Sequence, residues 1–144
     1  MTTVVVDASV VLKWFIEESL VDEAEGVLKT FDSLYAPGLV VAEVANAVWK
    51  KCLRGEITRA QADSIAEEML LSPLLYVPES ILCQRALEIA LTLRHPVYDC
   101  LYLACAESLE AELVTADSRF HAAIQNSDFA GRVIHLTALP DAPP

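Results

Sequence analysis

Short apolar runs rich in β-branched residues alternate along this chain with longer segments of helical periodicity. The runs typical of strands are Thr3–Val6, Leu34–Ala36, Leu113–Thr115 and Val133–Leu136, and Leu74–Val77 fits either a strand or a connector. The segments typical of helices are Ser9–Ile16, Leu20–Phe31, Leu39–Arg54, Thr58–Leu71, Glu79–Leu93, Asp99–Glu110 and Ser118–Gln125. This alternation predicts an α/β fold, a three-layer α/β/α domain with a mainly parallel central sheet.

The chain contains no internal repeat, low-complexity tract or linker. We therefore expect one domain over residues 1–138, followed by a short C-terminal tail at 139–144. Charged residues interrupt every long apolar stretch before the roughly 18 residues that a membrane span requires. The first apolar run stops at Asp7 with no basic segment before it, which argues against a signal peptide. We expect a cytoplasmic protein that does not bind membranes.

The charge balance is strongly acidic, with 10 Lys and Arg residues against 21 Asp and Glu residues and a net charge of -11. Such a chain repels polyanions, so composition alone predicts against a nucleic-acid-binding protein. The hydrophobic fraction of 54% is high for a monomer of 144 residues, which favours a homodimer or another partner surface.

Glycine and cysteine positions exclude several kinds of site. The four glycines are at least 12 positions apart, so neither a P-loop nor a G-x-G-x-x-G turn can form. The cysteines contain no C-x-x-C pair and show no zinc-ligand spacing with the histidines, and we expect all four to be small buried hydrophobes: Cys52, Cys83, Cys100 and Cys105.

Four acids lie at or near the carboxyl ends of the predicted parallel strands, where such sheets bind ligands. Asp7 and Asp117 follow predicted strands, Asp99 opens the helix that leads into the Leu113–Thr115 strand, and Glu43 lies early in the long helix. Ligands bind beyond the carboxyl ends of such strands. Helix N-caps are the plain explanation for the three aspartates, and a solvated helix face for Glu43. As a set, however, carboxylates in one cleft repel each other unless a hard cation such as Mg²⁺ neutralises them.

The segments around the four acids resemble, in order and spacing, the four motifs of PIN-domain ribonucleases. They are Val4-Val5-Val6-Asp7-Ala8-Ser9, Pro37 to Asn46 around Glu43, His95 to Ala104 around Asp99, and Val114-Thr115-Ala116-Asp117-Ser118-Arg119-Phe120. The resemblance extends from Val4 to about Leu136, and the size of the chain is most similar to the VapC-type toxins of bacterial toxin–antitoxin pairs.

The resemblance implies a metal-dependent endoribonuclease. Asp7, Glu43, Asp99 and Asp117 would hold one or two Mg²⁺ or Mn²⁺ ions for water attack on an RNA phosphodiester, leaving 5′-phosphate and 3′-hydroxyl ends. The supporting polar positions would be Ser9, Asn46 and Thr115. Some relatives carry a further acid where this chain has Ser118, and Asp128 lies too far along to replace it. The resemblance also implies an antitoxin partner and a homodimer.

The long helix offers a small basic stripe for RNA. At 100° per residue, Lys50 and Arg54 lie within about 20° of the direction of Glu43. The alternative is that these cations only favour the negative end of the helix. On the same helix, an i, i+4, i+7, i+11 pattern predicts a core-facing stripe of Val41, Ala45, Val48 and Cys52.

Four other residues have weaker claims to a role in RNA binding. Lys13 and Arg119 each follow a site acid but belong to no further pattern. Tyr98 and Trp14 could stack on bases, although we expect both in the core.

Two rival functions remain at this point. A haloacid-dehalogenase-type phosphatase also starts with a strand and an Asp, but its second acid is absent because Ser9 stands there. A catalytically silent PIN-fold interaction module is the alternative of another class, although a pure binding module has no reason to retain four mutually repelling acids.

Overall fold

A computed structural model describes residues 2–139 and contains a five-stranded, fully parallel sheet. Its strands lie in the order β3-β2-β1-β4-β5. Their bounds are β1 (Thr3–Val6), β2 (Ser33–Pro37), β3 (Leu75–Val77), β4 (Glu112–Thr115) and β5 (Val133–His135). The predicted parallel sheet is confirmed, and the ambiguous segment near Leu74 is a strand.

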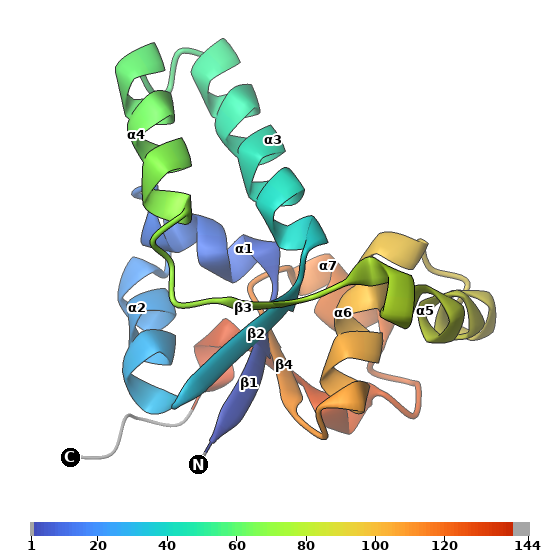
Figure 1. Cartoon of the computed structure of the whole chain (residues 1–144). Coiled ribbons are helices and arrows are strands. Elements are labelled where there is room, and N and C mark those ends of the chain that lie inside the picture. The colour runs from blue at the N-terminus through green and yellow to red at the C-terminus, as the bar shows by residue number, and fades with distance from the viewer. Residues whose placement is uncertain (1, 140–144) are drawn as a thin grey trace.

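Helices cover both faces of the sheet, as predicted for three layers (Figure 1). They are α1 (Ala8–Val11), α2 (Val21–Thr30), α3 (Leu39–Leu53), α4 (Arg59–Met69), α5 (Glu79–Leu93), α6 (Val97–Ser108) and α7 (Ser118–Ala123), with 3₁₀ turns η1 (Leu12–Trp14), η2 (Ala130–Arg132) and η3 (Leu136–Ala138). Helix α6 packs against β1, β2 and β4, and α5 packs against α6. Helices α3 and α4 project together beyond the sheet as an arm (Figure 1).

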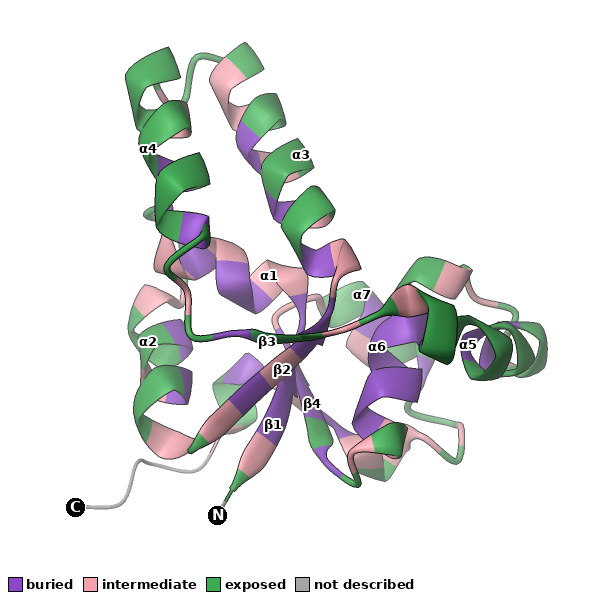
Figure 2. Ribbon diagram, viewed as in Figure 1, coloured by how far each residue is buried: buried purple, intermediate pink, exposed green. Residues whose placement is uncertain are grey.

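The core is centred on β1 and α6 (Figure 2). The three valines of β1 are fully buried because the strand is central and has helices on both faces, which explains a continuous apolar run without alternation. Helix α6 is buried from Cys100 through Ala106, so it has no solvent face over nearly two turns. The first acidic motif therefore follows a buried strand, and the third leads into a buried helix.

Two of the three aspartates are helix N-caps, and the third is not. Asp7 and Asp117 are the N-caps of α1 and α7, in agreement with the structural explanation from sequence. The prediction that Asp99 could be an N-cap is wrong, because Pro96 occupies that position and Asp99 lies inside the first turn of α6. Proline is favoured near helix starts, since its fixed φ is compatible with the helix and its missing N–H is not needed there.

The predicted core stripe of α3 is confirmed at Val48 and wrong at Val41 and Ala45. The side chains that α3 buries are Val40, Val44 and Val48, whereas Val41 and Ala45 are exposed and Cys52 is half-buried. Apolar residues occupy two neighbouring stripes of this helix, and periodicity alone does not show which of them faces the sheet. The second stripe lines a groove between α3 and α4.

The cysteines also depart from the prediction. Cys100 and Cys105 are buried, but Cys52 is half-buried and Cys83 is exposed on α5. All four are free thiols. Within the described range, no helix is long and apolar enough to cross a bilayer. Residues 140–144 of the predicted tail lie outside the described residues.

Candidate active site

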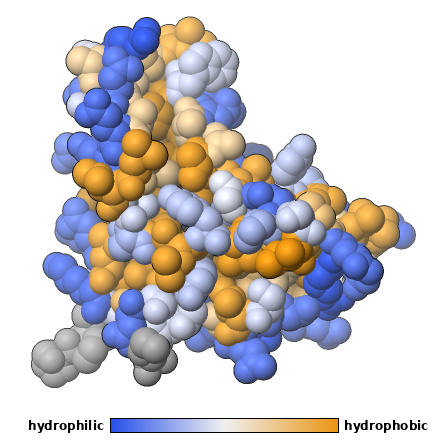
Figure 3. Space-filling view, in the orientation of Figure 1, coloured by the Kyte–Doolittle hydropathy of each residue, from blue (hydrophilic) through white to orange (hydrophobic). Residues whose placement is uncertain are grey.

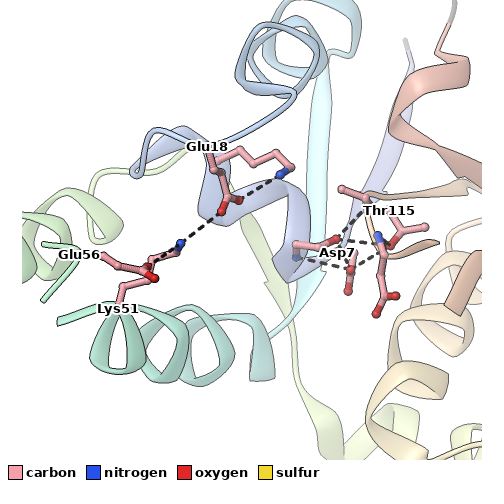
Figure 4. A network of polar contacts seen from close by, with 9 residues as sticks. Asp7, Glu18, Lys51, Glu56 and Thr115 are labelled. Atoms are coloured by element: carbon pink, nitrogen blue, oxygen red, sulfur yellow. Dashed lines mark hydrogen bonds and ion pairs between the residues drawn. The ribbon is translucent and has the colours of Figure 1, made fainter. Parts of the chain in front are cut away.

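Asp7 is a carboxylate held in the core at the end of β1. Its side chain is only 7% exposed, and its Oδ2 accepts hydrogen bonds from Ser9 Oγ at 2.5 Å and Thr115 Oγ1 at 3.0 Å. Burial raises the pKa of Asp7 above its ordinary value, and the charge of Asp99 raises it further, while the Ser9 and Thr115 hydroxyls lower it. Figure 4 shows Asp7 and Thr115 facing each other across the ends of β1 and β4. The prediction that Ser9 and Thr115 stand beside the acid is confirmed.

Glu43 lies on α3 against the buried centre of α6. Its Oε1 accepts a hydrogen bond of 2.8 Å from the hydroxyl of Tyr102, a residue with no exposed surface. Burial raises the pKa of Glu43 to about 7, and the charges of Asp7 and Asp99 act in the same direction. Burial also raises the pKa of Tyr102 far above its ordinary value, so the phenol stays protonated and donates.

Asp99 completes a group of three interacting carboxylates. It contributes to the raised pKa values of both Asp7 and Glu43. Its Oδ2 lies 2.6 Å from His95 Nε2. Asp99 thus lies close enough to Asp7 and Glu43 for its charge to act on both, and the fold brings three of the four predicted acids together.

Asp117 joins the group through hydrogen bonds of its main chain. Its backbone N–H donates to Thr115 Oγ1 at 3.0 Å, and the same hydroxyl donates to Asp7. Its side-chain Oδ1 accepts from the N–H groups of Arg119 and Phe120 at the start of α7. A cap role and a place at the carboxyl edge of the sheet are therefore combined in one residue.

Each of the four carboxylates uses one oxygen in the protein and leaves the other without a partner among residues 2–139. The bonded oxygens are Oδ2 of Asp7, Oε1 of Glu43, Oδ2 of Asp99 and Oδ1 of Asp117. The one buried side-chain atom without a partner in that part of the chain is Oε1 of Glu79, so the four unbonded oxygens are not sealed from solvent. A donor set of hard carboxylate oxygens with one free oxygen each fits Mg²⁺ or Mn²⁺.

The described side chains form no ready-made cage of three or more acids, histidines or cysteines around a metal position. Magnesium does not require such a cage, because it retains several waters and binds through one or two carboxylates and substrate phosphates. Burial is the main cause of the raised pKa values of Asp7 and Glu43, with the neighbouring acids acting in the same direction, and a bound cation would favour the ionised form of both carboxylates.

Several predicted residues lie outside this group. Asn46, Lys50 and Arg54 are exposed on α3, and no bond joins them to the acids within residues 2–139. Lys13 is buried and pairs with Glu18 at 3.0 Å, so it is not free to contact RNA.

The other three weaker candidates for RNA binding differ in how exposed they are. Arg119 is exposed at the start of α7. The expectation of a core position for Tyr98 is wrong, since 66% of it is exposed. Trp14 is half-buried, packs against the core and donates to the carbonyl of Ala24, which agrees with the expectation.

A chain of ion pairs joins the segment after η1 to the outer end of the α3–α4 arm. Glu18 accepts from Lys13 and lies 3.5 Å from Lys51 on α3, and Lys51 lies 3.4 Å from Glu56 in the turn before α4 (Figure 4). Lys51 is thereby committed to a structural contact, whereas its neighbour Lys50 is free of ion pairs within the described residues.

Two cavities of about 640 and 630 Å³ lie beside α4, and the four carboxylates line neither. The second is the groove between α3 and α4, whose lining includes Val41, Ala45, Trp49, Met69 and Leu70. Figure 3 shows apolar surface along the inner side of the arm. The groove and the acids are separate features of α3, which supplies residues to both.

Tyr102 and His95 are the contacts that sequence reasoning missed. Both lie inside the third acidic segment, but only the fold shows that Tyr102 reaches an acid 59 residues away. For His95 a local signal existed, because it precedes Asp99 by four residues.

Comparisons with known proteins agree with the fold. A model of the PIN domain family matches residues 4–124. The ribonuclease VapC3 of Pyrobaculum aerophilum is 30% identical over 115 residues, covering 78% of this chain and 88% of that protein. The ribonuclease VapC1 of Mycobacterium tuberculosis is 38% identical over 90 residues, covering 61% of this chain and 65% of that protein.

Two solved structures share the fold. A toxin–antitoxin complex from Klebsiella pneumoniae contains a chain with a TM-score of 0.64 and 19% identity, with 92% of this chain and 97% of that chain covered. A protein of Pyrobaculum aerophilum has a TM-score of 0.63 and 22% identity, with 94% and 90% covered.

Proposed function

This chain belongs to the PIN domain family, and from that premise we propose that it is a metal-dependent endoribonuclease, the toxin of a toxin–antitoxin pair. The observation that carries the proposal is the group of Asp7, Glu43 and Asp99, in which the charge of Asp99 raises the pKa of both other acids and the charge of Asp7 raises that of Glu43. Each of the three has one oxygen without a hydrogen-bond partner among the described residues. The similarity to proteins named ribonuclease VapC3 and VapC1 supports RNA as the substrate.

The residues that would hold Mg²⁺ or Mn²⁺ are Asp7, Glu43, Asp99 and Asp117. A bound divalent cation would supply a Lewis acid that stabilises the charge developing on the scissile phosphate and activates a water for attack. This chemistry suits a nuclease that leaves 5′-phosphate and 3′-hydroxyl ends.

Hydrogen-bond donors of the protein orient Asp7 and Glu43 and oppose the effect of burial on their pKa values. The hydroxyls of Ser9 and Thr115 hold Oδ2 of Asp7, and the phenol of Tyr102 holds Oε1 of Glu43. Without these donors, burial would favour the protonated acids, which bind cations poorly. Ser9 and Thr115 therefore serve as supporting residues, and Asn46, exposed on α3, stands nearer solvent and substrate.

We propose that RNA approaches along the exposed face of α3. Lys50 and Arg54 lie on the stripe of Glu43, and Lys50 is about 10 Å further along the helix axis, which suits a neighbouring phosphate. Both are exposed and free of ion pairs within the described residues, unlike Lys51. The net charge of -11 keeps nonspecific RNA affinity low, so RNA binding depends on this local basic stripe.

The groove between α3 and α4 is the surface that we propose for the antitoxin. Its lining is mainly apolar, and Trp49 is 57% exposed beside it. A segment with apolar side chains and a net positive charge would complement both the lining of the groove and the net charge of -11. The similarity to a chain from a toxin–antitoxin complex supports such a partner.

A second apolar surface supports the proposed homodimer. The outer side of α5 exposes Ile81, Leu87 and Leu91, away from the arm (Figure 3). Exposed apolar side chains at two separate places suit two different partners. The RNA substrate places the proposed site of action in the cytoplasm.

The direct test is cleavage of single-stranded RNA by the purified protein. Addition of EDTA should stop cleavage, and excess Mg²⁺ or Mn²⁺ should restore it, with 5′-phosphate ends on the products. Cleavage that persists in EDTA would contradict metal dependence. Absence of cleavage with either metal, in protein that still binds a partner, would favour a silent interaction module.

A further inference from the structure

His95 has a position that the ribonuclease proposal does not use. It lies in the connection between α5 and α6, and its Nε2 is 2.6 Å from Oδ2 of Asp99. A carboxylate only accepts hydrogen bonds, so Nε2 carries the proton and donates. Among the residues that the structure describes, no other group donates to the Asp99 side chain.

The backbone around His95 is fixed from both sides. Helix α5 ends with Arg94 in the left-handed region at φ 54°, and the N–H of His95 donates to the carbonyl of Ala90 at 3.2 Å. Pro96 follows as the N-cap of α6 with φ -55°. The His95 backbone is thereby held between two helix termini.

The imidazole ring is fixed by packing. Its centroid lies 5.4 Å from that of Phe120 on α7, and the residue is only partly exposed. The N–H of Phe120 donates to Oδ1 of Asp117. The imidazole of His95 therefore packs against Phe120, a residue of the same helix turn that holds the Asp117 side chain.

Pro96 also explains why Asp99 depends on His95. In a capping box, the side chain at the third position of a helix turns back and accepts from the N–H of the N-cap residue. Pro96 has no N–H, so this local bond cannot form. The carboxylate is left to the imidazole.

We infer that His95 is a positioning residue of the proposed metal site, which holds Oδ2 of Asp99 and leaves Oδ1 for the cation. The inference rests on the proposed function. Hydrogen-bond partners of metal-binding side chains typically contribute 10–100-fold to metal affinity. His95 therefore acts through Asp99 and does not ligate the metal.

The test compares two variants of the full chain that differ in one donor. His95→Gln retains an N–H donor near the position of Nε2, whereas His95→Phe retains a ring against Phe120 but donates nothing. Mn²⁺ binding is measured by calorimetry for both variants, for wild type and for Asp99→Asn, and thermal unfolding in EDTA records whether each is folded. If His95→Phe does not fold, His95→Leu takes its place.

We expect the Kd for Mn²⁺ to rise about tenfold or more in His95→Phe and to stay within about threefold of wild type in His95→Gln. Equal Mn²⁺ affinity in His95→Phe and wild type would overturn the inference, as would equal losses in both variants. A ¹⁴N coupling to bound Mn²⁺ in pulsed EPR would also overturn it, since His95 would then be a ligand. A wild-type protein that binds no Mn²⁺ would instead overturn the proposed function, and this inference with it.

Discussion

The hydroxyl of Tyr102 donates to Oε1 of Glu43 at 2.8 Å and joins the buried centre of α6 to the first half of α3. The phenol is fully buried and remains protonated, so it donates to Glu43 and favours the ionised form of that carboxyl group. Tyr102 thus opposes the burial that raises the pKa of Glu43 to about 7.

Tyr102→Phe should therefore raise the pKa of Glu43 further, because the variant removes the donor and keeps the ring. At pH 8 the variant should also lose about 1–3 kcal/mol of unfolding free energy, the cost of leaving a buried partner unsatisfied. Carboxyl ¹³C NMR of the metal-free protein measures the first effect, and urea unfolding the second. An unchanged Glu43 pKa would show that the hydrogen bond does not stabilise the charged form.

The stability of the metal-free protein should fall as pH rises from about 4.5 to about 7. The folded state holds the Glu43 proton in this window, whereas the unfolded state, with its ordinary pKa of 4.5, has released it. Folding therefore becomes less favourable, by at most about 3 kcal/mol from this residue. Asp7, whose pKa is also raised, contributes with the same sign.

Glu43→Gln provides the control for this pH dependence. It cannot ionise, so its unfolding free energy should show a smaller decline between these pH values than wild type. Saturating Mg²⁺ should likewise reduce the decline in wild type, because the cation favours the charged carboxylates. A Glu43→Gln protein with the same pH slope as wild type would assign the decline to other groups.

Lys50→Glu should weaken RNA binding and reduce its salt dependence. Each lost contact with a phosphate of single-stranded RNA lowers the slope of log K against log salt by about 0.7. The matched control is Lys29→Glu, which changes the net charge equally on the last turn of α2, beside the start of β2 and thus at the opposite edge of the sheet from the acids. Fluorescence anisotropy at several salt concentrations measures both. An equal loss of RNA affinity in the two variants would show that only the net charge of the protein matters and not the position of Lys50.

Trp49→Glu should abolish antitoxin binding while leaving RNA cleavage in place, because it puts a charge into the apolar groove between α3 and α4. The partner to use is the product of the neighbouring short reading frame, with calorimetry as the measurement. Leu91→Glu on α5 is the control and should weaken the homodimer alone. If antitoxin binding survives Trp49→Glu and fails in Leu91→Glu, the antitoxin binds α5 and not the groove between α3 and α4.

The elements with strong local signals were predictable from sequence. The run from Thr3 to Val6 and the helix Glu79–Leu93 have the predicted bounds, and Gly55 follows α3 with a φ of +77° as a helix C-terminus requires. The face of α3 was not predictable, because Val40 and Val41 begin two equally apolar stripes and tertiary packing selects one for the core.

The sequence indicated the four acids as candidates, but it did not indicate their environment. Position after a strand indicated Asp7 and Asp117, whereas the contacts of Glu43 with Tyr102 and of Asp99 with His95 depend on how helices pack. The N-cap expectation for Asp99 failed because Pro96 starts α6 earlier than the acid does.

RNA cleavage by carboxamide variants of the acids, measured together with their thermal stability, tests the proposed metal site most directly. Asp7→Asn and Asp99→Asn should each abolish RNA cleavage at saturating Mg²⁺, while the melting temperature in EDTA stays unchanged or rises because repulsion is relieved. Cleavage at the wild-type rate in either variant, or lost cleavage that accompanies a large drop in melting temperature without metal, would contradict a metal-binding role and leave these acids as structural residues.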